Sequence, residues 1–264
     1  MCYTIKQLKY REYKYTLRYG NLTNSERIKL QEEWIEYDLT HPEDVLDSYH
    51  INGFQHPKLV TAVDQGGLKA TRFQWGLIPH WVKDREQAEQ IMNKTLNARG
   101  ETIFEKPAFR DSANSKRCLI LVDGFYEYYH FKGKTYPFYI EPVNKEFFVF
   151  GGLWSEWIDK STGEIVQTAA IVTTEANVLM QKIHNKPNSS IGPRMPLILD
   201  EDELEIWLKS RDKSELQGII NPLEDGKIKA FTVGKLHGKD AVGDGPEAIE
   251  EVVYPELSEP GELF

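Results

Sequence analysis

The sequence contains little cysteine: Cys2 and Cys118 are the only two among 264 residues. Two cysteines cannot form a disulfide framework, and such scarcity is typical of a reducing compartment. No apolar run approaches the roughly 18 residues that a membrane span requires, and the opening segment MCYTIKQLKYREYKY is too polar for a signal peptide. These absences predict a cytoplasmic protein with no membrane contact. Cys118, within the apolar run RCLILV, is expected to be a buried and inert thiol.

Acidic residues outnumber basic residues, so the formal net charge is −9. This balance argues against indiscriminate nucleic-acid binding. The acidity is local, however. Residues 200–264 include 17 acidic and 7 basic residues, a balance of −10, whereas residues 1–199 include 24 and 25, a balance of +1. A basic groove within the first 199 residues is therefore compatible with the sequence.

A hydrophobic content of 40% predicts a globular core. Many short strand-like runs alternate with turn residues, and few helices intervene. This pattern predicts one compact α+β domain built round a curved, mainly antiparallel sheet with short peripheral helices. A weakly structured tail is expected from Asp244 onward. We expect helices at 25–38 (capped by Asn24), 175–183 and 203–208 (with a capping box of Asp200 and Glu203), and strands at 58–64, 68–75, 117–122, 126–131, 135–141, 146–153, 164–174 and 228–233.

Cys2 directly follows Met1, and removal of Met1 would leave an α-amine and a thiol on one residue. Their ordinary pKa values, near ~8 and ~8.5, keep a nucleophilic fraction of each at neutral pH. Such an aminothiol can close on an aldehyde, because the amine forms an imine and the sulfur then adds to give a thiazolidine ring. The alternative is that Cys2 is an ordinary residue at the start of the chain.

Two polar segments offer orienting and acid–base groups. Asn97 begins the cluster NARGET, which is also compatible with a helix cap that Glu101 completes. Glu127 lies among aromatic residues directly after an apolar strand, and strand alternation puts it on the face opposite Tyr126 and Tyr128. Glu127 is therefore a candidate general acid or base, although a solvated outer face is the simpler interpretation.

Two further segments contain a histidine and aromatic rings. His184, one of seven histidines, closes a predicted helix before the stretch 186–193, although a lone histidine is more often structural or exposed. The segment 75–81, WGLIPHW, is an aromatic turn stiffened by proline. Its rings suit a hydrophobic core, whereas an exposed Trp81 could stack on a base.

Taken in order, these pieces resemble the abasic-site processing family, also called the SOS response-associated peptidase family. The matching pieces are MC at the start, WGLIP at 75–79, NARGET at 97–102, RC at 117–118 leading to DGFYE at 123–127, and IHN at 183–185 with RMP at 194–196. The resemblance implies a domain of about residues 1–235 with a barrel-like β core, followed by an acidic tail, 236–264, that packs on it or trails from it. It also implies covalent capture of abasic sites in single-stranded DNA, with association with the nucleoid when DNA is damaged.

The resemblance also implies roles for single residues. Cys2 matches the family's N-terminal nucleophile, and Asn97 the residue that orients it. Glu127 matches the catalytic carboxylate, and His184 the catalytic histidine. An amine-only Schiff base would give a lyase side activity, and self-removal of the first residue fits the peptidase label.

DNA contacts are expected from arginine and aromatic side chains, because a guanidinium binds phosphate oxygens with two parallel hydrogen bonds and rings stack on bases. No metal, cofactor or obligate protein partner is predicted. The candidates are Arg99 and Arg194 from the matching motifs, Arg72 and Arg110 on a groove leading to Cys2, Trp81 near the DNA path, and Asn52 in a loop that family members often use to contact the strand.

Two departures from the family pattern stand out. Tyr3 and Thr4 follow Cys2 where relatives often have Gly-Arg, so one phosphate contact is missing or replaced. Nine residues, 185–193, separate His184 from Arg194 where relatives have only a few. This insertion puts the position of Arg194 in doubt more than that of His184.

Two other classes of function stay open on the sequence. An N-terminal-nucleophile amidohydrolase or peptidase would use Cys2 to attack a carbonyl, and it predicts an oxyanion hole beside Cys2 and no basic groove. A non-catalytic binding module predicts that Cys2 lies far from Asn97, Glu127 and His184.

Overall fold

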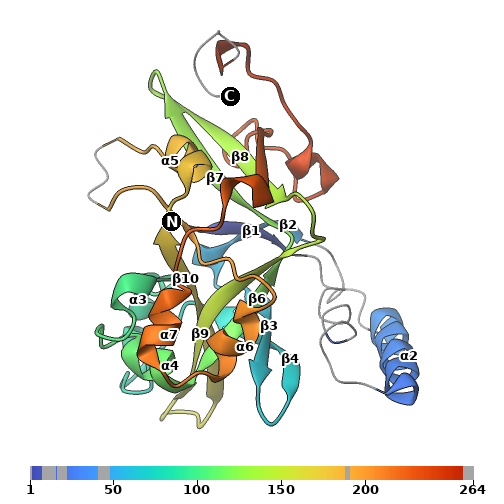
Figure 1. Ribbon diagram of the computed structural model, residues 1–264, viewed down its shortest axis with the longest axis vertical. Coiled ribbons are helices and arrows are strands. Elements are labelled where there is room, and N and C mark those ends of the chain that lie inside the picture. The colour runs from blue at the N-terminus through green and yellow to red at the C-terminus, as the bar shows by residue number, and fades with distance from the viewer. Residues whose placement is uncertain (1, 8–15, 17–22, 41–47, 188–190, 258–264) are drawn as a thin grey trace.

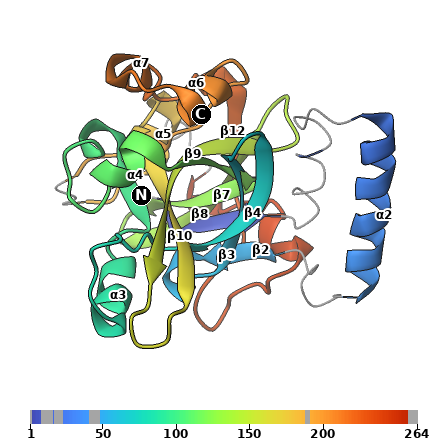
Figure 2. The same ribbon diagram turned by 90° about the horizontal axis from the view of Figure 1, so that it is seen from below.

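The computed structural model describes residues 2–7, 16, 23–40, 48–187 and 191–257. Its centre is a closed five-stranded barrel in the order β10–β4–β3–β6–β9, in which β9 pairs again with β10. All of these pairings are antiparallel except that between β10 and β4, and Figure 2 shows the barrel from below. The strands are β3 (Lys58–Asp64), β4 (Leu68–Trp75), β6 (Arg117–Val122), β9 (Phe148–Ile158) and β10 (Ile165–Glu175). The predicted α+β class with a barrel-like core is confirmed.

A second sheet of five antiparallel strands lies above the barrel in Figure 1, in the order β12–β8–β7–β1–β2. The pairing of β1 with β7 brings the start of the chain beside the strand that contains Glu127, since Ile5 pairs with Phe125. The strands are β1 (Thr4–Gln7), β2 (Ser48–Asn52), β7 (Gly124–Phe131), β8 (Lys134–Pro142) and β12 (Ile228–Thr232).

Two short strands extend the edges of β10. β5 (Asn97–Arg99) pairs with it in parallel, and β11 (Arg194–Pro196) pairs with it antiparallel. Asn97 is therefore a strand residue and not a helix cap. The helices are α2 (Asn24–Thr40), which stands apart from both sheets in Figures 1 and 2, α3 (Arg85–Met92), α4 (Arg110–Ser115), α5 (Val178–Ile183), α6 (Glu203–Lys209) and α7 (Lys213–Gly218).

Side-chain alternation along β7 separates two environments. Phe125 and Tyr129 join the large core cluster between the sheets, whereas Tyr126 and Tyr128 join a smaller cluster on the opposite face. Glu127 therefore shares the inner face with Phe125 and Tyr129, as the sequence pattern predicts.

The C-terminal segment packs against the second sheet. Asp244 accepts hydrogen bonds from Ser48 Oγ (2.9 Å) and from His50 N (2.7 Å) on β2, and Glu251 forms a bridge with Val233. The expectation of weak structure from Asp244 onward is wrong for residues 244–257, because these contacts hold the segment against the second sheet. The last seven residues lie outside the described part of the chain.

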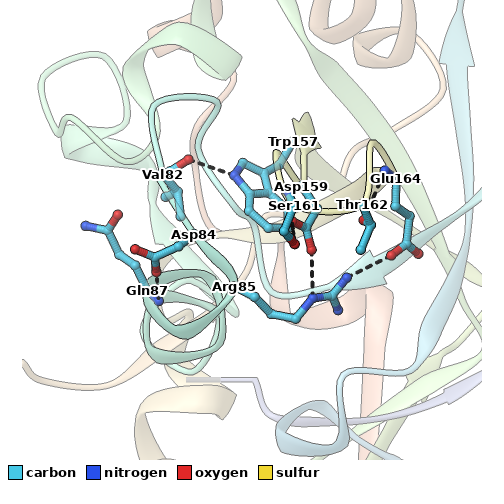
Figure 3. Close-up of polar contacts among 9 residues, drawn as sticks. All are labelled: Val82, Asp84, Arg85, Gln87, Trp157, Asp159, Ser161, Thr162 and Glu164. Carbon is cyan, nitrogen blue, oxygen red and sulfur yellow. Dashed lines mark hydrogen bonds and ion pairs between the residues drawn. The ribbon is translucent and has the colours of Figure 1, made fainter.

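A polar network joins α3 to the turn between β9 and β10 (Figure 3). Asp159 is 2% exposed and accepts from Arg85 Nε at 2.9 Å and from Ser161 N and Oγ at 2.9 and 2.6 Å. The same arginine reaches Glu164 at 2.8 Å. Hydrogen bonds from Ser161, and then Arg85, lower the pKa of Asp159 to about 2. The charged carboxylate is thus the form that holds this turn in place.

Candidate active site

Cys2 lies two residues before the start of β1 and is only 1% exposed. Its Sγ lies 3.9 Å from the carbonyl oxygen of Thr4. Burial, and secondly the negative charge of Glu127, raise the pKa of the thiol well above its usual range. The sulfur is therefore held as a neutral thiol at neutral pH.

Asn97 holds the backbone of Cys2 in place. Its Nδ2 donates to the carbonyl oxygen of Cys2 at 2.7 Å. The register that pairs Asn97 with Ile171 fixes the position of this amide. Its Oδ1 is buried and has no hydrogen-bond partner among the described residues. An orphaned acceptor beside Cys2 leaves a place for a donor, such as an amine or a hydroxyl group.

Glu127 and His184 form the second pair of the site. His184 caps the C-terminal end of α5, and its Nδ1 lies 3.3 Å from Glu127 Oε2, with about a tenth of each side chain exposed. The same nitrogen lies 3.0 Å from the carbonyl oxygen of Arg194. The backbone N–H of Arg194 also approaches this nitrogen, at 3.3 Å, so the backbone of Arg194 holds the ring beside Glu127.

The two pairs are coupled electrostatically. The charge of Glu127 raises the pKa of both Cys2 and Tyr3, in each case after the effect of burial. The structure thus brings Cys2 to Asn97 and Glu127 to His184, and it places Cys2 within the field of Glu127.

Asn185 fixes His184 in this position, and the sequence patterns gave it no role. Its Oδ1 accepts from His130 N at 2.7 Å, and its Nδ2 donates to His130 O at 3.0 Å. The side-chain amide thereby pairs with the backbone of β7 much as a neighbouring strand would. The end of α5 is held beside Glu127 at the point where the long insertion begins. Only its place next to His184 in the IHN motif could have drawn attention to it.

The two motif arginines differ in their surroundings. Arg99 is exposed at the end of β5. Arg194 is buried: its guanidinium lies 2.7 Å from a carboxylate oxygen of Glu101 and also donates to the hydroxyl and carbonyl oxygens of Thr173. Arg194 begins β11, which pairs with β10, and its side chain is buried there. A phosphate contact by Arg194 would require Glu101 to be displaced, so that role stays a prediction.

The remaining candidates lie on separate elements. Trp81 is 42% exposed, and its Nε1 donates to Pro107 O at 3.3 Å. Arg110 is exposed at the start of α4, and Arg72 is partly buried on β4. Asn52 caps the turn that follows β2, since its Oδ1 accepts from Phe54 N at 3.0 Å. The DNA-binding roles of these four residues stay predictions.

Cys118 is fully buried, as predicted, and burial raises the pKa of its thiol. Within the described ranges no group of three or more His, Cys, Asp or Glu side chains could hold a metal ion. In the same part of the chain, no helix is long and apolar enough to cross a membrane.

Comparison with known proteins identifies the class. The family model described as SOS response associated peptidase (SRAP) matches residues 17–239. The chain therefore belongs to the SRAP family.

Particular relatives agree with this assignment. Abasic site processing protein YoqW of Bacillus subtilis is 33% identical over 225 residues, which are 79% of this chain and 94% of that protein. Abasic site processing protein YoaM of the same organism is 35% identical over 211 residues, 74% of this chain and 87% of that protein. A crystal structure of a Bacteroides thetaiotaomicron protein is similar with a TM-score of 0.79 and 30% identity, and the match covers 96% of this chain and all of that one.

Proposed function

We propose that this protein processes abasic sites in single-stranded DNA by linking itself covalently to them through Cys2, after Met1 is removed. Removal of Met1 frees the α-amine of Cys2, and this amine attacks C1′ of the open aldehyde form of the abasic sugar. Loss of one water gives an imine. The thiol then adds across the C=N bond, with sulfur bonding to carbon and the proton going to nitrogen, and closes a thiazolidine ring.

The observation that carries the proposal is the position of Cys2. Asn97 holds its carbonyl, and the negative charge of Glu127, which lies against His184, acts on its thiol. Proton transfers that accompany carbinolamine formation and loss of water need a group that both donates and accepts, and a carboxylate next to an imidazole supplies this. Ring closure is intramolecular, so it does not need a large thiolate fraction.

The neutral thiol also bears on the alternative of a cysteine hydrolase. Attack on a carbonyl by such an enzyme uses a thiolate, and those thiolates have lowered pKa values. Burial and Glu127 act in the opposite direction on Cys2. We propose lyase-type strand cleavage and self-removal of Met1 as side activities of the same site. Self-removal is intramolecular, so, like ring closure, it does not need a large thiolate fraction.

The test is incubation with a single-stranded oligonucleotide that bears one abasic site, followed by a denaturing gel. We expect a heat-stable protein–DNA band from wild type. Cys2→Ala should lose that band and keep only a species that borohydride traps, since its α-amine survives. Cys118→Ala is the matched control and should behave as wild type. An undiminished heat-stable band from Cys2→Ala would refute the role of the thiol.

A further inference from the structure

Helix α2 presents a row of large apolar side chains to solvent. Ile28, Ile35 and Leu39 are 59%, 51% and 77% exposed. Ile35 and Leu39 follow Ile28 by seven and eleven residues, so at about 100° per residue the three positions lie within roughly 40° of one another on the helix surface. The helix stands apart from both sheets, across the molecule from α3 and α4 (Figures 1 and 2). Such an apolar stripe is typical of a surface that binds another protein chain.

The helix itself is set up by local contacts. Thr23 and Glu26 form a capping box: the carboxylate of Glu26 accepts from Thr23 N at 2.8 Å, and Glu26 N donates to Thr23 Oγ1 at 3.3 Å. Lys29 lies 3.6 Å from Glu33, four residues further along. Interactions of this kind stabilise a helix only weakly, so burial of the apolar stripe against a partner would add to the stability of α2.

Charge is segregated between the two halves of α2. Residues 24–31 contain two basic residues and one acidic residue, a balance of +1, whereas residues 32–40 contain four acidic residues and no basic residue, a balance of −4. A second copy of α2 laid antiparallel places the basic half of each helix beside the acidic half of the other. A parallel copy would place the two acidic halves side by side. The charges therefore favour an antiparallel second copy as the occupant of the stripe.

We propose that α2 is a self-association surface, on which α2 of a second copy packs antiparallel about a two-fold axis. The two-fold relation places Ile28 of each copy opposite Leu39 of the other, with Ile35 near the centre. The exposed side chains of Lys29 and Glu36 lie on one flank of the stripe, where Lys29 of each copy approaches Glu36 of the other. A helix of 17 residues is about 25 Å long, so the dimer buries less than the roughly 1,200 Å² of a standard interface and dissociates readily.

The test is sedimentation velocity at protein concentrations from about 5 to 500 µM. We expect wild type to pass from monomer to dimer with a dissociation constant on the order of 50 µM. Ile35→Glu should stay monomeric, because it places a carboxylate from each copy at the centre of the interface. The matched control is Ile165→Glu, which adds the same charge at a side chain that is 62% exposed on β10 and should dimerise as wild type does. Circular dichroism establishes that each variant is folded.

A charge exchange tests the antiparallel orientation. Lys29→Glu and Glu36→Lys should each weaken the dimer by roughly three- to tenfold, because each brings like charges together at both symmetric positions. The double variant restores unlike charges and should dimerise about as well as wild type.

Three results would each overturn the proposal: a wild type that is monomeric over the whole concentration range, an Ile35→Glu variant that dimerises as wild type does, or a double variant that dimerises no better than the single ones. Helix α2 lies outside the candidate active site, so any of these results would leave the covalent chemistry of Cys2 standing.

Discussion

The two polar side-chain atoms of Asn97 differ in their surroundings. Its Nδ2 anchors Cys2, whereas its buried Oδ1 is without a partner in the described part of the chain. A hydrogen bond contributes about 1 kcal/mol to stability, and an unsatisfied buried group costs about 1–3 kcal/mol. The side chain is thus better explained by what it does to Cys2 than by its contribution to stability.

Asn97→Ala should therefore lower the crosslinking rate by about tenfold or more while changing the free energy of unfolding by less than about 1 kcal/mol. Loss of the Nδ2 hydrogen bond destabilises the fold, whereas loss of the unsatisfied Oδ1 stabilises it, so the two effects offset each other in the free energy of unfolding. They do not offset each other in the crosslinking rate. Single-turnover crosslinking and urea denaturation measure the two quantities. Asn144→Ala, at an exposed asparagine, is the control. A rate unchanged from wild type would show that Asn97 does not orient Cys2.

The next prediction is that Arg99 contacts a phosphate group of the DNA. It is exposed at the end of the strand that contains Asn97. If it contacts one phosphate, Arg99→Ala should weaken DNA binding about equally for all sequences and reduce the slope of log affinity against log salt by about 0.7–1. Arg211→Ala, in the acidic C-terminal quarter, should keep the wild-type slope. Identical slopes for wild type and Arg99→Ala would mean that this arginine is structural.

At the scale of elements, the side-chain amide of Asn185 holds the C-terminal end of α5 in its position. Asn185→Ala should detach His184 from its fixed place beside Glu127, because the two hydrogen bonds to His130 are lost. We expect a crosslinking rate at least about fivefold lower and a pH–rate profile altered on its histidine limb. Asn185→Asp keeps the acceptor for His130 N and should recover part of the rate. Lys182→Ala, on the exposed side of α5, is the control. A lower rate with an unchanged pH profile would contradict the positioning role.

The contribution of the Asp159 network, which links α3 to the β9–β10 turn, to the stability of the fold should depend on pH. The folded state lowers the pKa of Asp159 from 3.8 to about 2, with Ser161 as the main cause and Arg85 next. A lowered pKa stabilises the fold fully above about pH 4, and this stabilisation is lost as pH falls through 2. Asp159→Asn should therefore have a lower urea midpoint than wild type at pH 7, and the difference should shrink toward pH 2. A difference that stays constant over this range would refute the linkage.

The strands and turns with local signals were predictable. The hairpin of β3 and β4 and the bounds of β6 agree with the sequence patterns, because alternation and the turn at 65–67 determine them locally. Helix α2 starts near the predicted place, yet Thr23, and not Asn24, forms the capping box with Glu26. Glu203 accepts from Asp200 N as predicted, whereas the carboxylate of Asp200 binds Lys145 and Lys227.

Elements that depend on distant partners were not predictable. β1, β2, β5 and β11 contain three to five residues each and exist because another strand offers an edge. The burial of Arg194 follows from β11 pairing with β10, which no local pattern encodes. In the same way, the identity of the four candidate catalytic residues came from motif order, whereas the hydrogen bonds of Asn185 to His130 appear only in the structure.

At the scale of the whole molecule, the two sheets divide the site between them. The barrel contributes Asn97 through the extended edge of β10, and the second sheet contributes Glu127 on β7 and Cys2 before β1. Helix α5 leaves the barrel strand β10 and brings His184 to the inner face of β7. A site assembled from both sheets can form only when the chain is fully folded.

The most direct measurement of the central claim is the intact mass of the purified protein before and after reaction with abasic single-stranded DNA, without reductant. We predict a starting mass that lacks Met1. We predict an adduct whose mass equals protein plus DNA minus one water and which survives heating, as a thiazolidine ring requires. A protein that retains Met1 and still forms this adduct, or an adduct that appears only after borohydride reduction, would contradict the account.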